Sequence, residues 1–264
     1  MEGATKVYPL DNQHPTSVDH HRALSMLFDP YTQQCAIGLL KLHGAACLEV
    51  GFGGGSFARW LADEVGPDGS VLATDIQPRE IPEHPSLTVL QHDIVDEPIP
   101  GTFDLIHARL VLGHLPQQRE ILTKLSKALK PGGVLLLEEW WSAANNIVTH
   151  APDAESADLV NTYSEATERV FPASGGALPW ARRMHGAMLE DGLVDVHTDV
   201  HAEAWAGGGW GCQLLKATLP QLRDKLLGVG LTDDLLDRVA VLLDDPRLVL
   251  IGQLICSTSG RKPA

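Results

Sequence analysis

Between residues 46 and 141, short apolar runs alternate with amphipathic runs, and no other feature constrains the fold as strongly. The apolar runs predict strands over Ala46–Val50, Ser70–Asp75, Leu87–His92, Asp104–Ala108 and Val134–Glu139. The runs between them predict helices over Gly55–Val65 and Pro116–Leu129. Strands that alternate with helices form a parallel sheet with helices on both faces. We therefore expect an α/β fold with a doubly wound sheet.

The pattern differs on both sides of this core. A capped helix that starts at Ser17 is expected to end at Pro30, and a second helix is expected over Thr32–Leu42. After Trp141 the pattern predicts helices over Ala154–Phe171, Leu178–Asp191, Gln213–Leu227 and Thr232–Leu243, and strands over Val194–Val200 and Leu248–Cys256. Since no long linker interrupts the chain, a single domain is expected over residues 1–264.

A glycine-rich loop joins the first predicted strand to the first helix of the core. It contains Gly51, Gly53, Gly54 and Gly55. Glycines at this place let the backbone turn tightly and let a ligand lie against the main chain. An ordinary strand-to-helix turn is the alternative interpretation of the loop alone.

The charge near this loop separates two nucleotide ligands. A dinucleotide places its pyrophosphate at the helix N-terminus and prefers Gly or Ala at the sixth loop position, where this chain has Ser56. Glu49 lies two residues before the first glycine and would repel that anion. S-adenosylmethionine carries a sulfonium and an ammonium group and no phosphate. Glu49 therefore favours this methyl donor over NAD.

Two further acids follow predicted strands. Asp75 ends the second strand, where a carboxylate can accept hydrogen bonds from both ribose hydroxyls. Asp93 follows the third strand and could accept from an adenine amino group, while Ile94 packs on the ring. Taken alone, Asp93 is more often a cap or a loop acid. Acids at three successive strand ends indicate a nucleoside site.

These segments resemble the motifs of class I S-adenosylmethionine-dependent methyltransferases, in order and spacing, over about residues 46–141. The matching segments are Cys47-Leu48-Glu49-Val50-Gly51-Phe52-Gly53-Gly54-Gly55, Thr74-Asp75-Ile76, Gln91-His92-Asp93-Ile94, Phe103-Asp104-Leu105-Ile106-His107-Ala108-Arg109 and Leu129-Lys130-Pro131-Gly132-Gly133. The resemblance implies a Rossmann-like, seven-stranded sheet whose last strand is antiparallel. It also implies a cofactor site lined by Glu49, Gly51, Phe52, Gly53, Gly55, Ser56, Asp75, Ile76, His92, Asp93, Ile94, Ala108 and Arg109.

The N-terminal segment is similar to the lid of a bacterial branch of this family. The similarity lies in Tyr8-Pro9-Leu10-Asp11-Asn12, in Arg22 and in Phe28-Asp29-Pro30. Tyr8 or Arg22 is expected to close over the cofactor carboxylate, and a solvated Arg22 is the alternative. We thus expect a helical lid over 1–45, a cofactor-binding core over 46–141, a helical substrate cap over 142–192 and, over 193–264, strands and helices that complete the sheet.

Candidate catalytic residues lie at the carboxyl ends of the fourth and fifth strands, where α/β sheets bind ligands. Among the polar residues there, which also include His107 and Glu139, we select His114, Arg109 and Glu138. His114 is the preferred base, because histidine titrates near neutral pH; packing of the turn before Pro116 is its alternative role. Arg109 is expected to bind a carboxylate or to form an ion pair. Glu138 and Glu139 point to opposite faces, so only one can face the pocket.

Tryptophans gather in the second half of the chain. Trp140 and Trp141 end the fifth strand, and with Trp180 they predict an aromatic wall around an apolar or aromatic substrate. Core packing is the alternative role for tryptophan.

Composition excludes several other classes of function. A net charge of −14 opposes nucleic-acid binding, which needs clustered Lys and Arg. No apolar stretch is long enough for a membrane span, and no secretion signal is visible, so a cytoplasmic location is expected. His197 and His201 lie in an alternating segment, and the four cysteines form no C-x-x-C pair, so no metal is expected.

The leading hypothesis is an enzyme that methylates a small, apolar or aromatic molecule, on oxygen, in bacterial specialised metabolism. The first alternative is a peptide or protein carboxyl methyltransferase. The second is a methyltransferase-like cyclase or binding protein that transfers no methyl group, and an NAD-dependent oxidoreductase is a more distant one. The oligomeric state stays open, with a homodimer as one option.

Overall fold

A computed structural model describes residues 14–141, 147–173 and 178–264. The chain forms two compact units, each with a sheet of its own. The larger unit comprises Phe28–Trp141, Pro179–His201 and Ile255–Ala264. The smaller unit comprises the described parts of Met1–Leu27, Ser142–Leu178 and Ala202–Leu254. Whether residues 1–264 form one methyltransferase domain, with the lid and cap expected above, stays a prediction.

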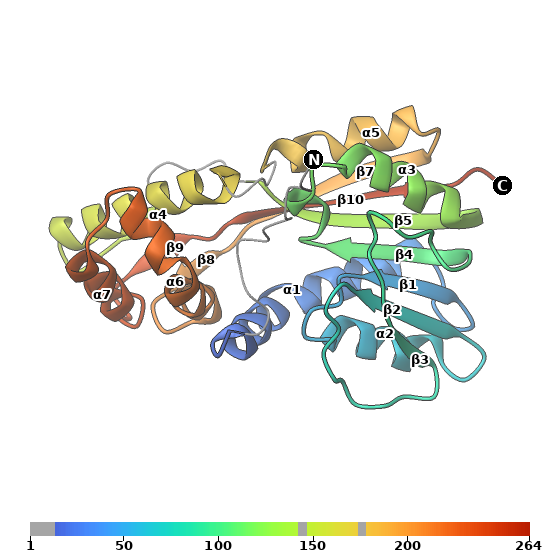
Figure 1. The fold of residues 1–264 in the computed structure, drawn as a ribbon, viewed down its shortest axis with the longest axis horizontal. Helices are drawn as coiled ribbons and strands as arrows, with labels where there is room; N and C mark the ends of the chain where they lie inside the picture. Colours follow the sequence, from blue (N-terminus) through green and yellow to red (C-terminus); the bar gives the residue numbers. More distant parts are fainter. Residues whose placement is uncertain (1–13, 142–146, 174–177) are drawn as a thin grey trace, which may run out of the picture. The chain divides into compact units, whose positions relative to one another are not determined.

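A seven-stranded sheet forms the centre of the larger unit, with the strand order β3-β2-β1-β4-β5-β10-β7 (Figure 1). Its strands are β1 (Ala46–Val50), β2 (Ser70–Asp75), β3 (Leu87–Gln91), β4 (Phe103–Arg109), β5 (Leu129–Trp141), β7 (Val194–His201) and β10 (Leu254–Arg261). Strands β1 to β5 pair in parallel, and β10 runs antiparallel to β7. The predicted seven-stranded α/β fold with an antiparallel last strand is confirmed.

Helices cover both faces of this sheet because both faces of its central strands are apolar. Leu105 and Leu136 point toward a cluster that includes Ala36 of α1 (Ser17–Leu39) and Leu61 of α2 (Ser56–Val65). The alternate residues of the same strands point toward α3 (Gln118–Ala128) and α5 (Met184–Glu190). The strand order reverses between β1 and β4, and in open α/β sheets ligands bind at this place, beyond the carboxyl ends of the strands.

The predicted break at Pro30 is wrong, because α1 continues through this residue to Leu39. A proline inside a helix removes one hydrogen bond and costs about 3 kcal/mol. Tertiary contacts after the proline compensate for this cost. Thr32 is buried in hydrogen-bonding contact with the sheet, and Ala36 is buried in the core. Residues 28–39 therefore belong to the larger unit, with one side of the helix buried against its sheet.

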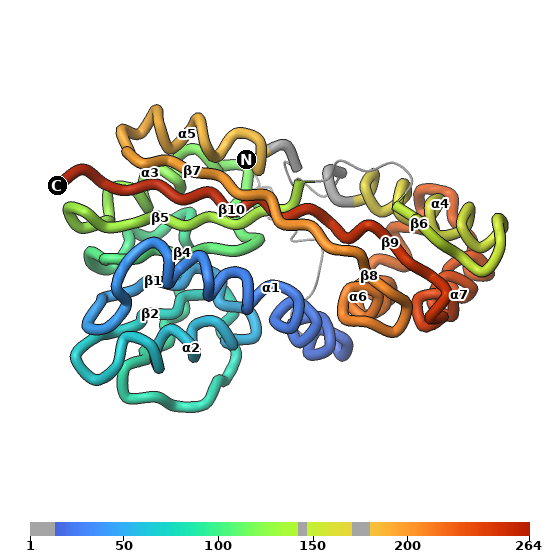
Figure 2. The backbone as a smooth tube through the Cα atoms, turned by 180° about the vertical axis from the view of Figure 1, so that it is seen from behind, coloured from blue at the N-terminus to red at the C-terminus, as the bar shows by residue number. Residues whose placement is uncertain are grey.

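In its described residues, the smaller unit contains three longer helices besides the start of α1, and a short sheet of order β6-β9-β8 (Figure 2). Its elements are β6 (Val148–His150), α4 (Ala154–Ala173), β8 (Ala204–Ala206), α6 (Trp210–Gly228), α7 (Asp233–Leu242) and β9 (Val249–Ile251). The first turns of α1 pack here as well, since Thr16 donates a hydrogen bond to the Ala217 carbonyl and His20 contacts Thr218. None of the described helices has the length and apolarity needed to cross a membrane.

The single strand predicted over Leu248–Cys256 is also wrong, because this segment forms β9 and β10 in two different sheets. Gly252 separates them and lies against the ring of Trp205. A Cβ atom at residue 252 would come 2.5 Å from the indole, so only glycine fits. The apolar run is continuous in the sequence, and hydropathy alone therefore gives no sign of the break.

Two short 3-10 helices are also present among the described residues. One is η1 (Leu112–His114), which follows β4, and the other is η2 (Leu178–Arg182), which precedes α5. The predicted helix over Pro116–Leu129 corresponds to α3, and the predicted helix over Leu178–Asp191 corresponds to η2 and α5.

Candidate functional site

The glycine loop lies at the carboxyl end of β1, and its backbone requires glycine at specific places. Gly51, Gly53 and Gly55 all have positive φ angles, of 67°, 53° and 79°. A Cβ atom on Gly51 would lie 2.4 Å from the side chain of Val111. The N–H of Gly51 donates to the Thr74 carbonyl at 2.7 Å, which ties the loop to β2. The loop is thus a narrow cradle of bare main chain.

Asp75 ends β2 beside this cradle. One carboxylate oxygen accepts a hydrogen bond from the Gln77 N–H at 2.9 Å, and the other lies 3.4 Å from the Gly53 nitrogen. Burial raises the pKa of Asp75, while the two backbone donors oppose that rise. Ile76, the next residue, has an exposed side chain. The predicted ribose acid therefore borders the glycine loop, and its apolar neighbour is exposed beside it in the sequence.

The predicted adenine residues follow β3. Asp93 accepts a hydrogen bond from the Val95 N–H at 2.8 Å, as a loop acid does. Ile94 is buried in the core cluster. His92 is buried too: Nε2 lies 3.0 Å from the Pro98 carbonyl oxygen, whereas Nδ1 has no hydrogen-bond partner among the described residues.

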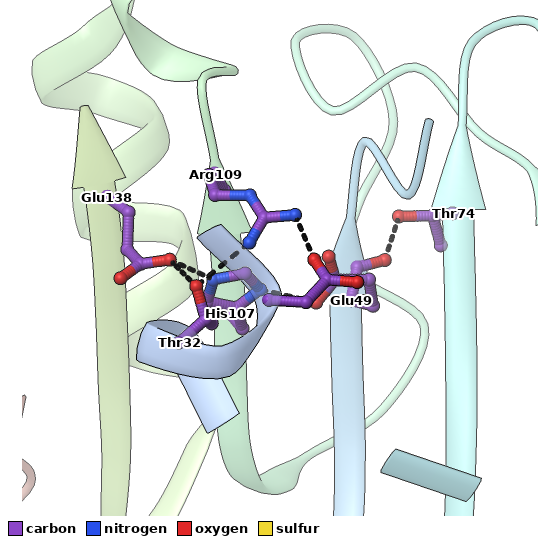
Figure 3. Close-up of polar contacts among 7 residues, drawn as sticks. Thr32, Glu49, Thr74, His107, Arg109 and Glu138 are labelled. Carbon is purple, nitrogen blue, oxygen red and sulfur yellow. Dashed lines mark hydrogen bonds and ion pairs between the residues drawn. The ribbon is translucent and has the colours of Figure 1, made fainter. Parts of the chain in front are cut away.

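A buried polar cluster occupies the α1 face of the sheet, next to the glycine loop (Figure 3). His107 lies at its centre, with Nδ1 2.6 Å from Glu49 Oε2 and Nε2 3.3 Å from Glu138 Oε2. Register explains this meeting, because Glu49 and His107 are paired positions on neighbouring strands. Glu138 also accepts hydrogen bonds from Thr32 at 2.5 Å and from Ser257.

Arg109 joins this cluster to α1. Its guanidinium donates to Asp29 at 2.6 Å and to Thr32 at 2.8 Å. The predicted ion-pair role of Arg109 thus has a partner on α1. Glu138 is fully buried, and each of its oxygens accepts from a protein donor. This arrangement favours a supporting role for Glu138 over direct contact with a substrate.

The charges in the cluster shift the protonation of its members. Burial lowers the pKa of His107, but the Glu49 charge and the contacts with Glu138 outweigh this and raise that pKa to about 9. Burial raises the pKa of Glu49, and the His107 charge opposes the rise. Burial also disfavours ionised Glu138, yet hydrogen bonding and charge from His107 lower its pKa below the usual value. His107 is therefore an imidazolium between two carboxylates.

The turn after β4 holds the preferred base candidate. Leu110 begins it with a φ of 58°, a left-handed conformation that costs a non-glycine residue about 1–2 kcal/mol. Glu139, on the face opposite Glu138, accepts a hydrogen bond from the Gly113 N–H at 2.9 Å. Burial raises the pKa of Glu139 to about 7 and lowers the pKa of His114 to about 4. His114 is therefore neutral at pH 7, as a base must be, although its basicity is low.

The three selected tryptophans do not lie together on one face of the sheet. Trp140 packs edge-on against Phe28 of α1, with ring centroids 5.0 Å apart. Trp141 packs against the cluster on the other face, in which Trp180 is buried, and the Arg182 guanidinium lies 5.0 Å from the Trp141 centroid. Alternation along β5 explains the separation. A single wall made from all three is therefore not formed.

The remaining predicted cofactor residues have different surroundings. Phe52 and Ala108 have buried side chains, so only their backbone atoms can face a ligand, whereas Ser56 is exposed at the start of α2. Arg22 belongs to the smaller unit, where it lies over the Trp210 ring at 5.3 Å. Tyr8 lies outside the described residues. The described chain contains no group of three or more His, Cys, Asp or Glu side chains arranged to hold a metal ion.

Sequence reasoning selected Glu49 and Glu138 but missed the residue that joins them. His107, Thr32 and Asp29 complete the cluster from two elements that are far apart in the sequence. A signal was present in β4. His107 and Arg109 are alternate polar residues in a strand whose other residues are mostly apolar, which indicates a polar partner on that face.

Comparisons with known proteins show which family the chain belongs to. A family model described as a methyltransferase domain matches residues 21–187. Methyltransferase str2 of Strobilurus tenacellus is 38% identical over 135 residues, which cover 50% of this chain and 49% of that protein. The chain thus spans about half the length of this relative.

Solved structures share the fold at low sequence identity. The YcgJ protein of Bacillus subtilis has a TM-score of 0.53 at 14% identity, covering 93% of this chain and 100% of its own. Phosphoethanolamine N-methyltransferase 2 of Haemonchus contortus has a TM-score of 0.52 at 16% identity, covering 89% of this chain and 53% of its own. Because the family model covers more than half of the sequence, the chain belongs to the methyltransferase domain family.

Proposed function

We propose that this chain is an S-adenosylmethionine-dependent methyltransferase that acts on a small, apolar or aromatic molecule, with oxygen as the methyl acceptor. The observation that carries the proposal is the arrangement at the carboxyl edge of the sheet. Glu49, the glycine loop and Asp75 lie together there, in a member of the methyltransferase domain family.

The residues at this edge fit the cofactor in shape. A side chain on Gly51 would collide with Val111, so the cradle admits only bare backbone at this point. Asp75 is placed beside Gly53 to accept from ribose hydroxyls, and Asp93 and Ile76 would flank the adenine. Nδ1 of buried His92, which has no hydrogen-bond partner in the described part of the chain, offers a further polar atom near the end of β3.

The residues also fit the cofactor in charge. Glu49, Glu138 and Asp29 supply three carboxylates, against the cations of His107 and Arg109. The cluster therefore keeps one net negative charge in a buried place, where an unbalanced charge is costly. An ammonium group next to Glu49 would balance it. When bound, S-adenosylmethionine supplies an electrophilic methyl group on a cationic sulfonium.

The acceptor is assigned from the turn after β4 and from the aromatic residues. His114 is neutral at physiological pH and would receive a proton from a hydroxyl group. Trp141, which packs on the same face of the sheet as Trp180, would contact an apolar ring from the end of β5. A second acceptor atom has support from similarity. A ubiquinone/menaquinone biosynthesis C-methyltransferase of Stutzerimonas stutzeri is 26% identical over 129 residues, which makes carbon the alternative. Specialised metabolism, the bacterial branch and a cytoplasmic location stay predictions.

Calorimetry on the purified chain tests the cofactor assignment. We expect S-adenosylhomocysteine to bind and NADH not to bind. Binding of NADH alone would contradict the assignment.

Transfer of a labelled methyl group tests the activity. The chain, S-adenosylmethionine labelled at the methyl group and a panel of phenols, quinols, amines and peptides are incubated together, and products are identified by mass spectrometry. A methyl ether supports oxygen as the acceptor, and a ring-methylated product supports carbon. Cofactor binding with no methyl transfer to any member of the panel would favour the binding-protein alternative.

A further inference from the structure

Glu49 is held from outside the glycine loop, by a fully buried imidazole. His107 contacts Glu49 through Nδ1 and Glu138 through Nε2, at 2.6 and 3.3 Å. Carboxylate oxygens only accept hydrogen bonds when ionised, so an imidazole between two of them needs a proton on both nitrogens. The contacts of His107 fix its orientation, and with two ionised partners they require the imidazolium form.

Each helix or strand that packs against His107 carries side chains that hold this arrangement in place. The polar side chains of this surrounding are Arg109 on β4, Glu138 on β5, Ser257 on β10, and Asp29, Tyr31, Thr32 and Cys35 on α1. Burial raises the pKa of Tyr31 and of Cys35, so both stay neutral. Helix α2 contributes the Phe57 ring, 4.5 Å from the imidazole, and no charge. His107 is therefore the only cation, among the described residues, in hydrogen-bonding contact with Glu49.

The two carboxylate oxygens of Glu49 differ in their hydrogen bonding. Oε2 is occupied by His107, whereas Oε1 accepts no hydrogen bond from a described residue. A buried carboxylate without a neighbouring cation takes up a proton, because desolvation disfavours its charged form. A protonated Glu49 would donate a hydrogen bond and could not accept one from an ammonium group.

We propose that His107 is a positioning residue of the cofactor site: its imidazolium keeps Glu49 ionised and fixes Oε2, so that Oε1 receives the cofactor ammonium group. Glu138, which accepts a hydrogen bond from Thr32, holds the imidazolium in turn. This inference rests on the proposed function, since it names a residue that acts on the cofactor through Glu49.

Calorimetric titration with S-adenosylhomocysteine between pH 5.5 and 7.5 tests the proposal. The wild type is expected to bind with nearly constant affinity. H107Q removes the cation, so we expect about tenfold weaker binding at pH 5.5 and an affinity that recovers as the pH rises and Glu49 ionises. A variant with a purely structural defect would lose affinity equally at each pH, and that result would overturn the proposal.

Matched variants separate this effect from general damage. H185Q removes a half-buried histidine that contacts Thr198 in the same unit, and it is expected to bind like the wild type. H107Q/E49Q should bind as weakly as E49Q, within about twofold, because His107 acts through Glu49. Additive losses would contradict the proposal.

A measurement on the wild type serves if H107Q does not fold. Nitrogen-15 spectra of the histidine side chains, with His107 assigned by its shift in E138Q, should show a doubly protonated ring at pH 7.5. A neutral His107 ring would overturn the inference and leave the proposed function intact. If the wild type binds no S-adenosylhomocysteine at any pH, the proposed function fails, whatever the charge of His107.

Discussion

The carboxylate of Glu139 lies under the turn that follows β4 and accepts a hydrogen bond from the Gly113 N–H at 2.9 Å. The two residues are packed closely, since a Cβ atom on Gly113 would lie 2.7 Å from Glu139 Oε2. The N–H groups of Leu112 and Val111 also act on this carboxylate. Glu139 thus joins the end of β5 to the turn that carries His114.

Stability should depend on pH through Glu139. Burial raises the pKa of this carboxyl to about 7 from the ordinary 4.5, so the folded state binds more protons than the unfolded state between these values. The resulting stability is fully present below pH 4.5 and is lost as the pH rises to 7, by about 3 kcal/mol. We expect E139Q to lack this loss. Chemical denaturation of both proteins from pH 4.5 to 8 checks this expectation, and parallel profiles would contradict the raised pKa of Glu139.

His107 should produce a second, separate dependence at higher pH. Its folded-state pKa of about 9 exceeds the ordinary 6.5, so its contribution is complete below pH 6.5 and is lost as the pH rises through 9. The loss amounts to about 3 kcal/mol. Denaturation from pH 6.5 to 9.5 should show the decline in the wild type and a flatter profile in H107Q. An equal decline in both proteins would place the titration elsewhere.

Asp75 should matter for nucleoside binding more than for folding. D75N keeps the shape of the side chain but removes the charge that ribose hydroxyls would contact. Because hydrogen bonds to charged groups contribute about 1.5–3 kcal/mol, affinity for S-adenosylhomocysteine should fall at least about tenfold. D63N is the control, since Asp63 is exposed and pairs with Arg59 on α2. Equal affinity of D75N and D63N would remove Asp75 from the site.

Gly51 and Gly44 provide a matched pair for the cradle. Both have positive φ angles, of 67° and 80°, so alanine at either position carries the cost of a left-handed backbone. Only G51A adds a collision, with Val111 at 2.4 Å, whereas nothing lies within 4 Å of a Cβ on Gly44. We expect G51A to melt at a lower temperature than G44A and to lose cofactor affinity. If the two variants melt together and bind alike, the cradle is wider than the contacts indicate.

The fold was predictable because its central strands are mostly apolar on both faces and its turns contain glycine. The alternation over residues 46–141 predicted β1 to β5 and the helices between them. The errors at Pro30 and Gly252 have a common origin. At Pro30, contacts of Thr32 with the sheet outweigh a local helix break; at Gly252, a packed indole divides an apolar run. Both depend on partners that are distant in the sequence.

The part of the site that lies at the ends of adjacent strands was predictable. Glu49, Gly51 and Asp75 lie at the ends of adjacent strands, so their meeting follows from the sheet. The polar cluster was not predictable in the same way, because Thr32 reaches Glu138 across 106 residues of sequence. The separation of Trp140 from Trp141 could have been inferred, since neighbouring residues of a strand point to opposite faces.

Leu110 opens the turn after β4 in a left-handed conformation that glycine or asparagine would adopt at lower cost. Selection for heat resistance and selection for turnover should therefore diverge at this residue. A library screened only for survival at high temperature would accept glycine or asparagine at residue 110. A library screened for product would keep a side chain that restricts the conformations of the turn. Sequencing residue 110 in both populations would reveal whether evolution retained this strain for the sake of the reaction.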